Sequence, residues 1–163
     1  MKQIFDVAIV GLCFGISLTS TAFAQTAKDL VGTWVAVSNV NIGQDGRRVD
    51  VFGPRAKGVA IFESNHHFAI VNIDPDTPKF VSNRRSHGTP EEYKAAVLGG
   101  IALFGTYWVS NKTIFFTVEG STYPNWTGTE QVRTVVHYTD NELTWSLASS
   151  IGGTSEVVWK RVR

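Results

Sequence analysis

The chain has 163 residues, of which 43% carry apolar, 12% aromatic and 18% charged side chains, so a disordered or collagen-like chain is excluded. Fifteen lysines and arginines nearly balance fourteen aspartates and glutamates, which leaves a formal net charge of +1. Because this balance creates no strong surface field, we expect no nucleic acid partner.

Residues 1–24 have the features of a secretory signal peptide. Lys2 supplies a positive charge, residues 7–18 form a short apolar run, and Ala22-Phe23-Ala24 places small residues where signal peptidase cleaves. A membrane-spanning helix needs roughly twenty apolar residues, so we expect no stable membrane insertion. Cleavage after Ala24 predicts a periplasmic or secreted domain of residues 25–163, and an uncleaved N-terminal anchor is the alternative.

Cleavage at this position would also remove Cys13, the only cysteine of the chain. A domain without a thiol has no disulfide, no thiolate nucleophile and no cysteine-ligated metal. Residues 25–163 must therefore be held together by burial of apolar side chains, which is feasible because a domain of this length buries about two thirds of its unfolded surface.

Eight runs rich in Val, Ile, Phe, Thr, Tyr and Trp are separated by short polar segments, as in an antiparallel all-β domain. Eight such strands can close into an up-and-down barrel, which encloses room for one small ligand, and a two-sheet sandwich is the alternative. The predicted strands are residues 30–39, 58–63, 67–73, 104–110, 113–120, 130–138, 142–148 and 155–162.

One segment predicts a short helix among these strands. Thr89, Pro90 and Glu92 form a capped helix start, in which side chains satisfy the free amides of the first turn. The helix should cover residues 90–98 and end at Gly99. Because its apolar residues fall on one face, we expect it to lie across the sheet or over an opening of the barrel.

Several segments, in this order and spacing, resemble the bacterial and fungal lipocalin-like domain family across nearly the whole exported domain. They include Leu30-Val31-Gly32-Thr33-Trp34, Gly88-Thr89-Pro90-Glu91-Glu92-Tyr93 and Gly128-Thr129-Glu130-Gln131-Val132-Arg133. Gly32-Thr33-Trp34 looks like the G-x-W signature of lipocalins, whose Trp plugs the closed end of the barrel. The resemblance implies an eight-stranded antiparallel lipocalin-like barrel with a cavity, in which Arg161 is the candidate for the basic residue that covers Trp34. It implies no single reaction.

Glu119 and Arg133 are the candidate functional pair. If their strands form a hairpin centred on Trp126, the two residues face each other as cross-strand partners. The alternation of apolar residues around them favours the outer surface, whereas a ligand-binding lumen would turn polar anchors inward. The sequence leaves both orientations open.

If the pair faces inward, the Arg133 guanidinium could hold a carboxylate, phenolate or carbonyl group of a ligand. Glu119 would then fix the guanidinium or exchange a proton. Further residues are candidates to line the same ligand site, and Trp126 could instead cap the barrel. The polar candidates are Gln131, His137 and Tyr107, and the apolar candidates are Phe115, Tyr93 and Trp126.

We expect no metal and no cofactor. His66 and His67 are adjacent on a predicted strand, so their side chains point to opposite faces and cannot easily bind one ion. The sequence has no H-E-x-x-H spacing, no glycine-rich phosphate loop and no G-x-S-x-G motif.

Three functions remain open. The favoured one is an exported protein that binds a small hydrophobic or amphipathic molecule in the barrel, which requires an open apolar lumen. An alternative is a cofactor-free isomerase, cyclase or decarboxylase, which requires Glu119 to be buried near a second proton-handling group. A structural or interaction module, with side chains filling the barrel, is the third. The sequence does not assign an oligomeric state.

Overall fold

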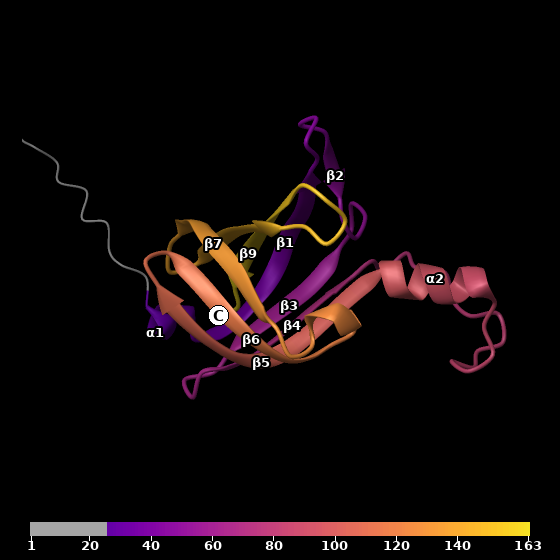
Figure 1. Ribbon diagram of the computed structural model, residues 1–163, viewed down its shortest axis with the longest axis horizontal. Helices are drawn as coiled ribbons and strands as arrows, with labels where there is room; N and C mark the ends of the chain where they lie inside the picture. The colour runs from indigo at the N-terminus through magenta and orange to yellow at the C-terminus, as the bar shows by residue number, and fades with distance from the viewer. Residues whose placement is uncertain (1–25) are drawn as a thin grey trace, which may run out of the picture.

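A nine-stranded antiparallel sheet makes up most of the computed structural model, which describes residues 26–163 (Figure 1). The predicted signal peptide lies outside the described residues. The strands are β1 (Gly32–Ile42), β2 (Arg48–Asp50), β3 (Lys57–Phe62), β4 (His67–Ile73), β5 (Gly100–Ser110), β6 (Thr113–Ser121), β7 (Glu130–Tyr138), β8 (Glu142–Ala148) and β9 (Thr154–Arg161).

Strand β1 closes the sheet into a barrel because it is hydrogen-bonded on both sides. Its first four residues pair with β3, and residues 34–42 pair with β9, the last strand of the sheet. The eight strands β1 and β3–β9 therefore form a closed antiparallel barrel. This confirms the predicted architecture and excludes the alternative of a two-sheet sandwich. The ninth strand, β2, is a short addition that pairs only with the end of β1.

The predicted helix is present as α2 (Pro90–Leu98). The Thr89 hydroxyl accepts a hydrogen bond from the Glu92 amide, and the Glu92 carboxylate accepts one from the Thr89 amide, as the capping pattern predicts. The expected location was wrong: no residue of α2 is buried, and the helix projects from the barrel (Figure 1). The Asp74 amide donates to the Gly99 carbonyl oxygen at 2.7 Å. This hydrogen bond holds together the two ends of the segment 74–99, which carries α2, while the helix extends outward.

The barrel is closed at one end around Trp34, which is fully buried. Its indole Nε1 donates to the Leu30 carbonyl oxygen of the short helix α1 (Ala27–Leu30) at 2.8 Å. The Arg161 guanidinium carbon lies 4.0 Å from the centre of the Trp34 ring, so Arg161 covers the tryptophan as the resemblance implies. The same guanidinium donates to three main-chain carbonyl oxygens, those of Asp29, Val31 and Asp140.

Aromatic side chains fill the interior next to this closed end. Phe68 and Phe116 meet edge to face with ring centres 4.5 Å apart, and Phe62 meets Tyr107 at 5.0 Å. All four residues are buried, and such pairs add stabilisation beyond the burial of their area. The packed half of the barrel supports the open half, where the cavity lies. Within residues 26–163, no helix is long and apolar enough to cross a membrane.

Candidate functional site

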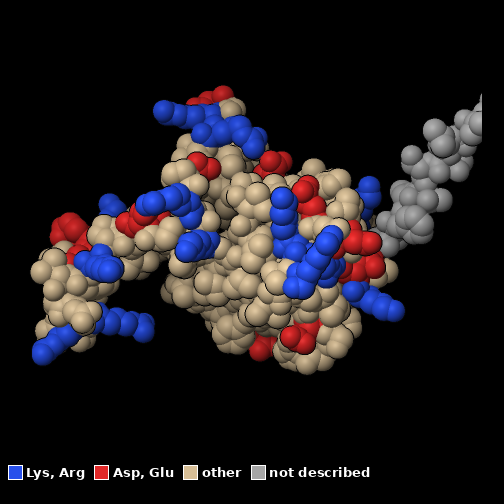
Figure 2. All heavy atoms as spheres, turned by 180° about the vertical axis from the view of Figure 1, so that it is seen from behind, with Lys and Arg blue, Asp and Glu red and all other residues tan. Residues whose placement is uncertain are grey.

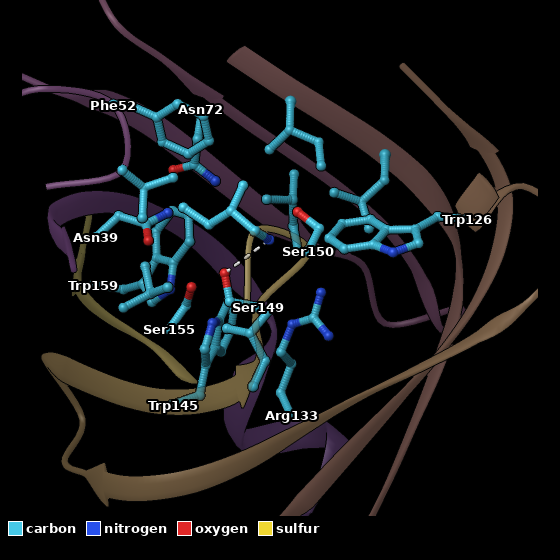
Figure 3. A pocket seen from close by; sticks show the side chains of 17 residues that line it. Asn39, Phe52, Asn72, Trp126, Arg133, Trp145, Ser149, Ser150, Ser155 and Trp159 are labelled. Carbon is cyan, nitrogen blue, oxygen red and sulfur yellow. Dashed lines mark hydrogen bonds between the residues drawn. The ribbon is translucent and has the colours of Figure 1, made fainter. Parts of the chain in front are cut away.

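A cavity of about 70 Å³ occupies the end of the barrel opposite α1 (Figure 3). Its rim comes from the segment after β2, from the 3₁₀ turn η1 (Pro124–Trp126) and from the β8–β9 turn. One water molecule needs about 10–15 Å³ of such space, so the cavity holds a small group and opens to solvent. Three tryptophans, Trp126, Trp145 and Trp159, and several aliphatic side chains form its walls. The polar lining residues are Asn39, Asn72, Arg133, Ser149, Ser150 and Ser155.

Among the residues that the structure describes, Arg133 is the only charged one that lines this cavity. Its side chain rises from β7 toward Trp126 (Figure 3), and the residue is 5% exposed. The guanidinium carbon lies 5.5 Å from the Trp126 ring centre and 5.7 Å from that of Phe116. One hydrogen bond, from Nη1 to the Val132 carbonyl oxygen at 2.9 Å, is its only one to the described residues. No acidic side chain among residues 26–163 lines the cavity, so within the described part of the chain this buried charge has no carboxylate partner.

Burial lowers the pKa of Arg133 to about 10, from an ordinary value of 12.5. A lowered pKa means that the charged form is less stable in the folded protein than in the unfolded chain. At neutral pH the guanidinium is charged in both states, so the cost applies at every pH below about 10 and is relieved only above it. The cost is on the order of 3 kcal/mol, a large fraction of the stability of a small domain.

Two other buried polar atoms belong to residues that line the same cavity. Asn39 Oδ1 and Trp159 Nε1 have no hydrogen-bond partner in the described part of the chain. A buried polar atom without a partner costs about 1–3 kcal/mol. Together with Arg133, the two atoms make this wall of the cavity costly for the stability of the fold.

A bulge in β1 turns Asn39 into the barrel. The pairing with β9 shifts between Ala36 and Ser38, so the inward positions change from Trp34, which is buried, and Ala36, which is partly buried, to Asn39 and Asn41. Without the extra residue, strict alternation would place Ser38 and Val40 inside and both asparagines outside. The side-chain amide of Asn41 donates to the Gly152 carbonyl oxygen at 3.0 Å. This bond connects β1 to the β8–β9 turn at the rim.

The expected pairing of Glu119 with Arg133 was wrong. Arg133 lies opposite Ile114 on β6, so the register differs by five residues from a hairpin centred on Trp126. Glu119 falls at a bulge, because Phe104 pairs with Gly120 and the next residue of β5 pairs with Val118. The glutamate side chain is exposed, while Arg133 is buried.

The cause of this error lies in the connection between β6 and β7. The connection contains the η1 turn and extends beyond the tight turn that a symmetrical hairpin requires. In addition, β7 has apolar residues on both faces, since Val132 and Val136 are exposed while Val135 is buried. Apolar alternation in β7 therefore does not distinguish the inner face from the outer face.

One short hydrogen-bond network connects Trp126 and Gln131 at the entrance of the cavity. The Thr129 hydroxyl donates to the Trp126 carbonyl oxygen at 2.8 Å, and the Gln131 amide donates to the Thr129 hydroxyl at 3.0 Å. Trp126 lines the cavity, and Gln131 fixes the loop that carries it without lining the cavity itself. Trp126 therefore forms part of the wall at the entrance.

The other four candidate lining residues lie outside the cavity. The Tyr107 hydroxyl is at the closed end and donates to the Ala27 and Glu63 carbonyl oxygens. Phe115 stacks on Trp108 on the outer surface, with ring centres 3.9 Å apart. The remaining two are His137, which is exposed beside Glu142, and Tyr93, which belongs to the projecting helix α2 and packs on Phe80.

His137 faces outward because β7 carries a bulge of its own, where the pairing with β8 shifts between Val135 and His137. Tyr93 borders a separate open hollow between α2 and the outer face of β4 and β5.

Among residues 26–163, no three His, Cys, Asp or Glu side chains are grouped so that they could hold a metal ion. On the face that Figure 2 shows, charged residues of both signs are interspersed.

The sequence interpretation missed most of the cavity wall. Trp145 and Trp159 carry a usable signal, since each is the large residue at an inward position of a predicted strand. Asn39 and Asn72 carry none, because polar residues in a strand usually indicate its outer face. Phe52 and the β8–β9 turn lie in connections, where periodicity gives no information. The residues not identified from the sequence include Asn39, Phe52, Asn72, Trp145, Ser155 and Trp159.

Replacing Arg133 with methionine should stabilise the protein, because methionine fills much of the same space without a buried charge. We expect the melting temperature of Arg133→Met to rise by at least about 3 °C in calorimetry. Lys160→Met, which removes a charge from the exposed surface, should change it by less than about 2 °C. A clear fall for Arg133→Met would show that the guanidinium supports the fold, and would remove the argument that it is kept for a ligand.

Comparisons with known proteins give one family match and several similar solved structures. Residues 31–162 match the family model described as a lipocalin-like domain. No curated protein shows significant sequence similarity to the chain. A redesigned β-barrel of known structure is 13% identical, with 86% of this chain and 98% of that chain covered and a TM-score of 0.42. A de novo designed fluorescence-activating β-barrel is 15% identical, with 83% and 96% covered and a TM-score of 0.41. The family match spans most of the chain, and the protein belongs to the lipocalin-like domain family.

Proposed function

We propose that this protein is exported and binds a small, largely apolar molecule in the open end of its barrel. The observation that carries the proposal is the cavity whose walls are Trp126, Trp145 and Trp159 and whose single charge is Arg133. Ligand pockets are typically concave and apolar, with a few polar groups that fix the orientation of the ligand. The cavity has this composition.

The arrangement of Glu119 and Arg133 favours binding over catalysis. A proton-transfer mechanism with this pair requires the glutamate next to the substrate, and Glu119 is on the outer surface. No carboxylate and no imidazole belongs to the residues that line the cavity, so none of them is a general base. A purely structural module is disfavoured for a different reason, since a filled barrel would leave no cavity at this end.

The position of Trp126 explains how a ligand could enter. The tryptophan belongs to a 3₁₀ turn at the rim and is half-buried, whereas Trp145 and Trp159 are at most 2% exposed. Its ring packs against Tyr123 on the outer side and lies over the Arg133 guanidinium on the inner side. Of the three tryptophans in the wall, Trp126 is thus the one with room to move, and we expect it to contact the bound molecule.

Export is tested by the mass of the mature protein. Expressed as the full chain in a bacterium with a periplasm, the protein should be recovered from the periplasm or the medium with Gln25 as its first residue. Intact-mass measurement by native mass spectrometry checks this cleavage site. A cytosolic protein that retains residues 1–24 would contradict export.

Binding is tested with 2-naphthalenemethanol, a neutral molecule whose planar rings suit an aromatic wall. We expect saturable binding in isothermal titration calorimetry, and we expect Trp126→Ala to weaken it about tenfold, which corresponds to the loss of one aromatic contact. Trp108→Ala is the matched control, because Trp108 stacks on Phe115 on the outer surface and should leave the affinity unchanged. Absence of saturable binding, or an equal effect of the two variants, would contradict a ligand site in the cavity.

A further inference from the structure

We infer that the ligand is an apolar organic acid with a single negative charge, whose carboxylate or similar oxyanion is held by the Arg133 guanidinium. This inference rests on the proposed function and adds to it the chemical class of the ligand. It comes from the surroundings of Arg133, from the charges in the cavity wall and from the composition of that wall.

The first argument is the unused hydrogen-bonding capacity of Arg133. A guanidinium has five N–H donors, and here one of them meets the Val132 carbonyl oxygen. Trp126 and Phe116 attract the cation through the faces of their rings, but these faces do not replace hydrogen-bond acceptors in the plane of the guanidinium. A carboxylate does, since it accepts two parallel hydrogen bonds from one guanidinium. The ligand group that best completes this site is therefore a planar oxyanion.

The second argument is the charge balance of the cavity. Arg133 is the one cation among the lining residues, and no acidic side chain of the wall neutralises it. An anion with one charge would pair with it and leave the buried end of the barrel neutral. A phosphate ester with two charges would leave one of them buried without a partner, which costs several kcal/mol in surroundings of this kind. The site thus favours a monoanion over a phosphate.

The third argument concerns the remainder of the ligand. Beyond Arg133 the wall consists mainly of indole rings and of aliphatic groups such as Ile70, Leu103 and Val157. A small hydrophilic anion would gain nothing from this wall and would lose its hydration. An acid with an apolar body gains from both parts, because its body covers the tryptophans while its oxyanion meets the guanidinium. Burial also lowers the pKa of Arg133, and an anion beside it would reverse this effect.

The test compares two probes that share one ring system. 2-Naphthoate carries a carboxylate, and 2-naphthalenemethanol carries a neutral hydroxymethyl group at the same position. Calorimetry at pH 7 gives the affinity of both probes for the wild-type chain and for three variants. In Arg133→Met the charge is absent, and in Arg133→Lys the charge remains without the planar donor pair. Lys160→Met removes one exposed positive charge and controls for the overall field of the protein.

We expect the wild-type protein and Lys160→Met to bind naphthoate at least about tenfold more tightly than the alcohol. In Arg133→Met this preference should disappear while the alcohol still binds, and in Arg133→Lys it should be smaller than in the wild type. Continued binding of the alcohol to Arg133→Met shows that this variant is folded.

The two proposals fail in different ways. Equal affinity of the wild type for the acid and the alcohol, or an acid preference that survives in Arg133→Met, would overturn the inference and leave the proposed function intact. Absence of binding for both probes would overturn the proposed function as well. A preference lost equally in Lys160→Met would trace the effect to the surface charge and would also overturn the inference.

Discussion

Strand β1 carries the constraint on which the rest of the structure depends, because it is hydrogen-bonded to β3 on one side and to β9 on the other. This double pairing gives the barrel one interior, and every inward side chain must share it. At the end near α1 the interior is filled by aromatic rings and sealed by Trp34 under Arg161. At the other end the same strands enclose a cavity, so one barrel contains both a packed core and an open pocket.

The cavity is unusual because it contains a charge that the protein itself does not neutralise. A buried cation without a carboxylate partner lowers stability, and such groups are retained mainly where function requires them. Arg133 is held by the rings of Trp126 and Phe116, which supply some attraction while leaving its donors free. Under the proposed function, this loss of stability is the trade-off expected of a site that is ready for an anion.

The sequence was sufficient for the eight barrel strands and for α2, because strand periodicity, turn residues and the Thr89–Glu92 capping pattern are local signals. It did not predict α1, β2 or the η1 turn. The site depends on non-local features that these signals do not contain. A bulge in β1 turns Asn39 inward, a bulge in β7 turns His137 outward, and the long β6–β7 connection shifts the register of Arg133. One extra residue in a strand reverses the faces of all following residues, so small local irregularities decided which candidates reached the cavity. Arg133 and Trp126 were identified from the sequence as site residues. Glu119, which was expected to lie opposite Arg133, is on the outer surface instead.

The five tryptophans allow the central claim to be tested within one molecule. Trp126, Trp145 and Trp159 line the cavity, whereas Trp34 lies at the closed end and Trp108 on the outer surface. With ¹⁵N-labelled indoles, we would follow the five side-chain N–H signals by NMR while adding 2-naphthoate. The account predicts large shifts for the three cavity signals and little change for the other two. A shift centred on Trp108, or no shift in any cavity signal at saturating probe, would contradict the assignment of the ligand site to the open end of the barrel.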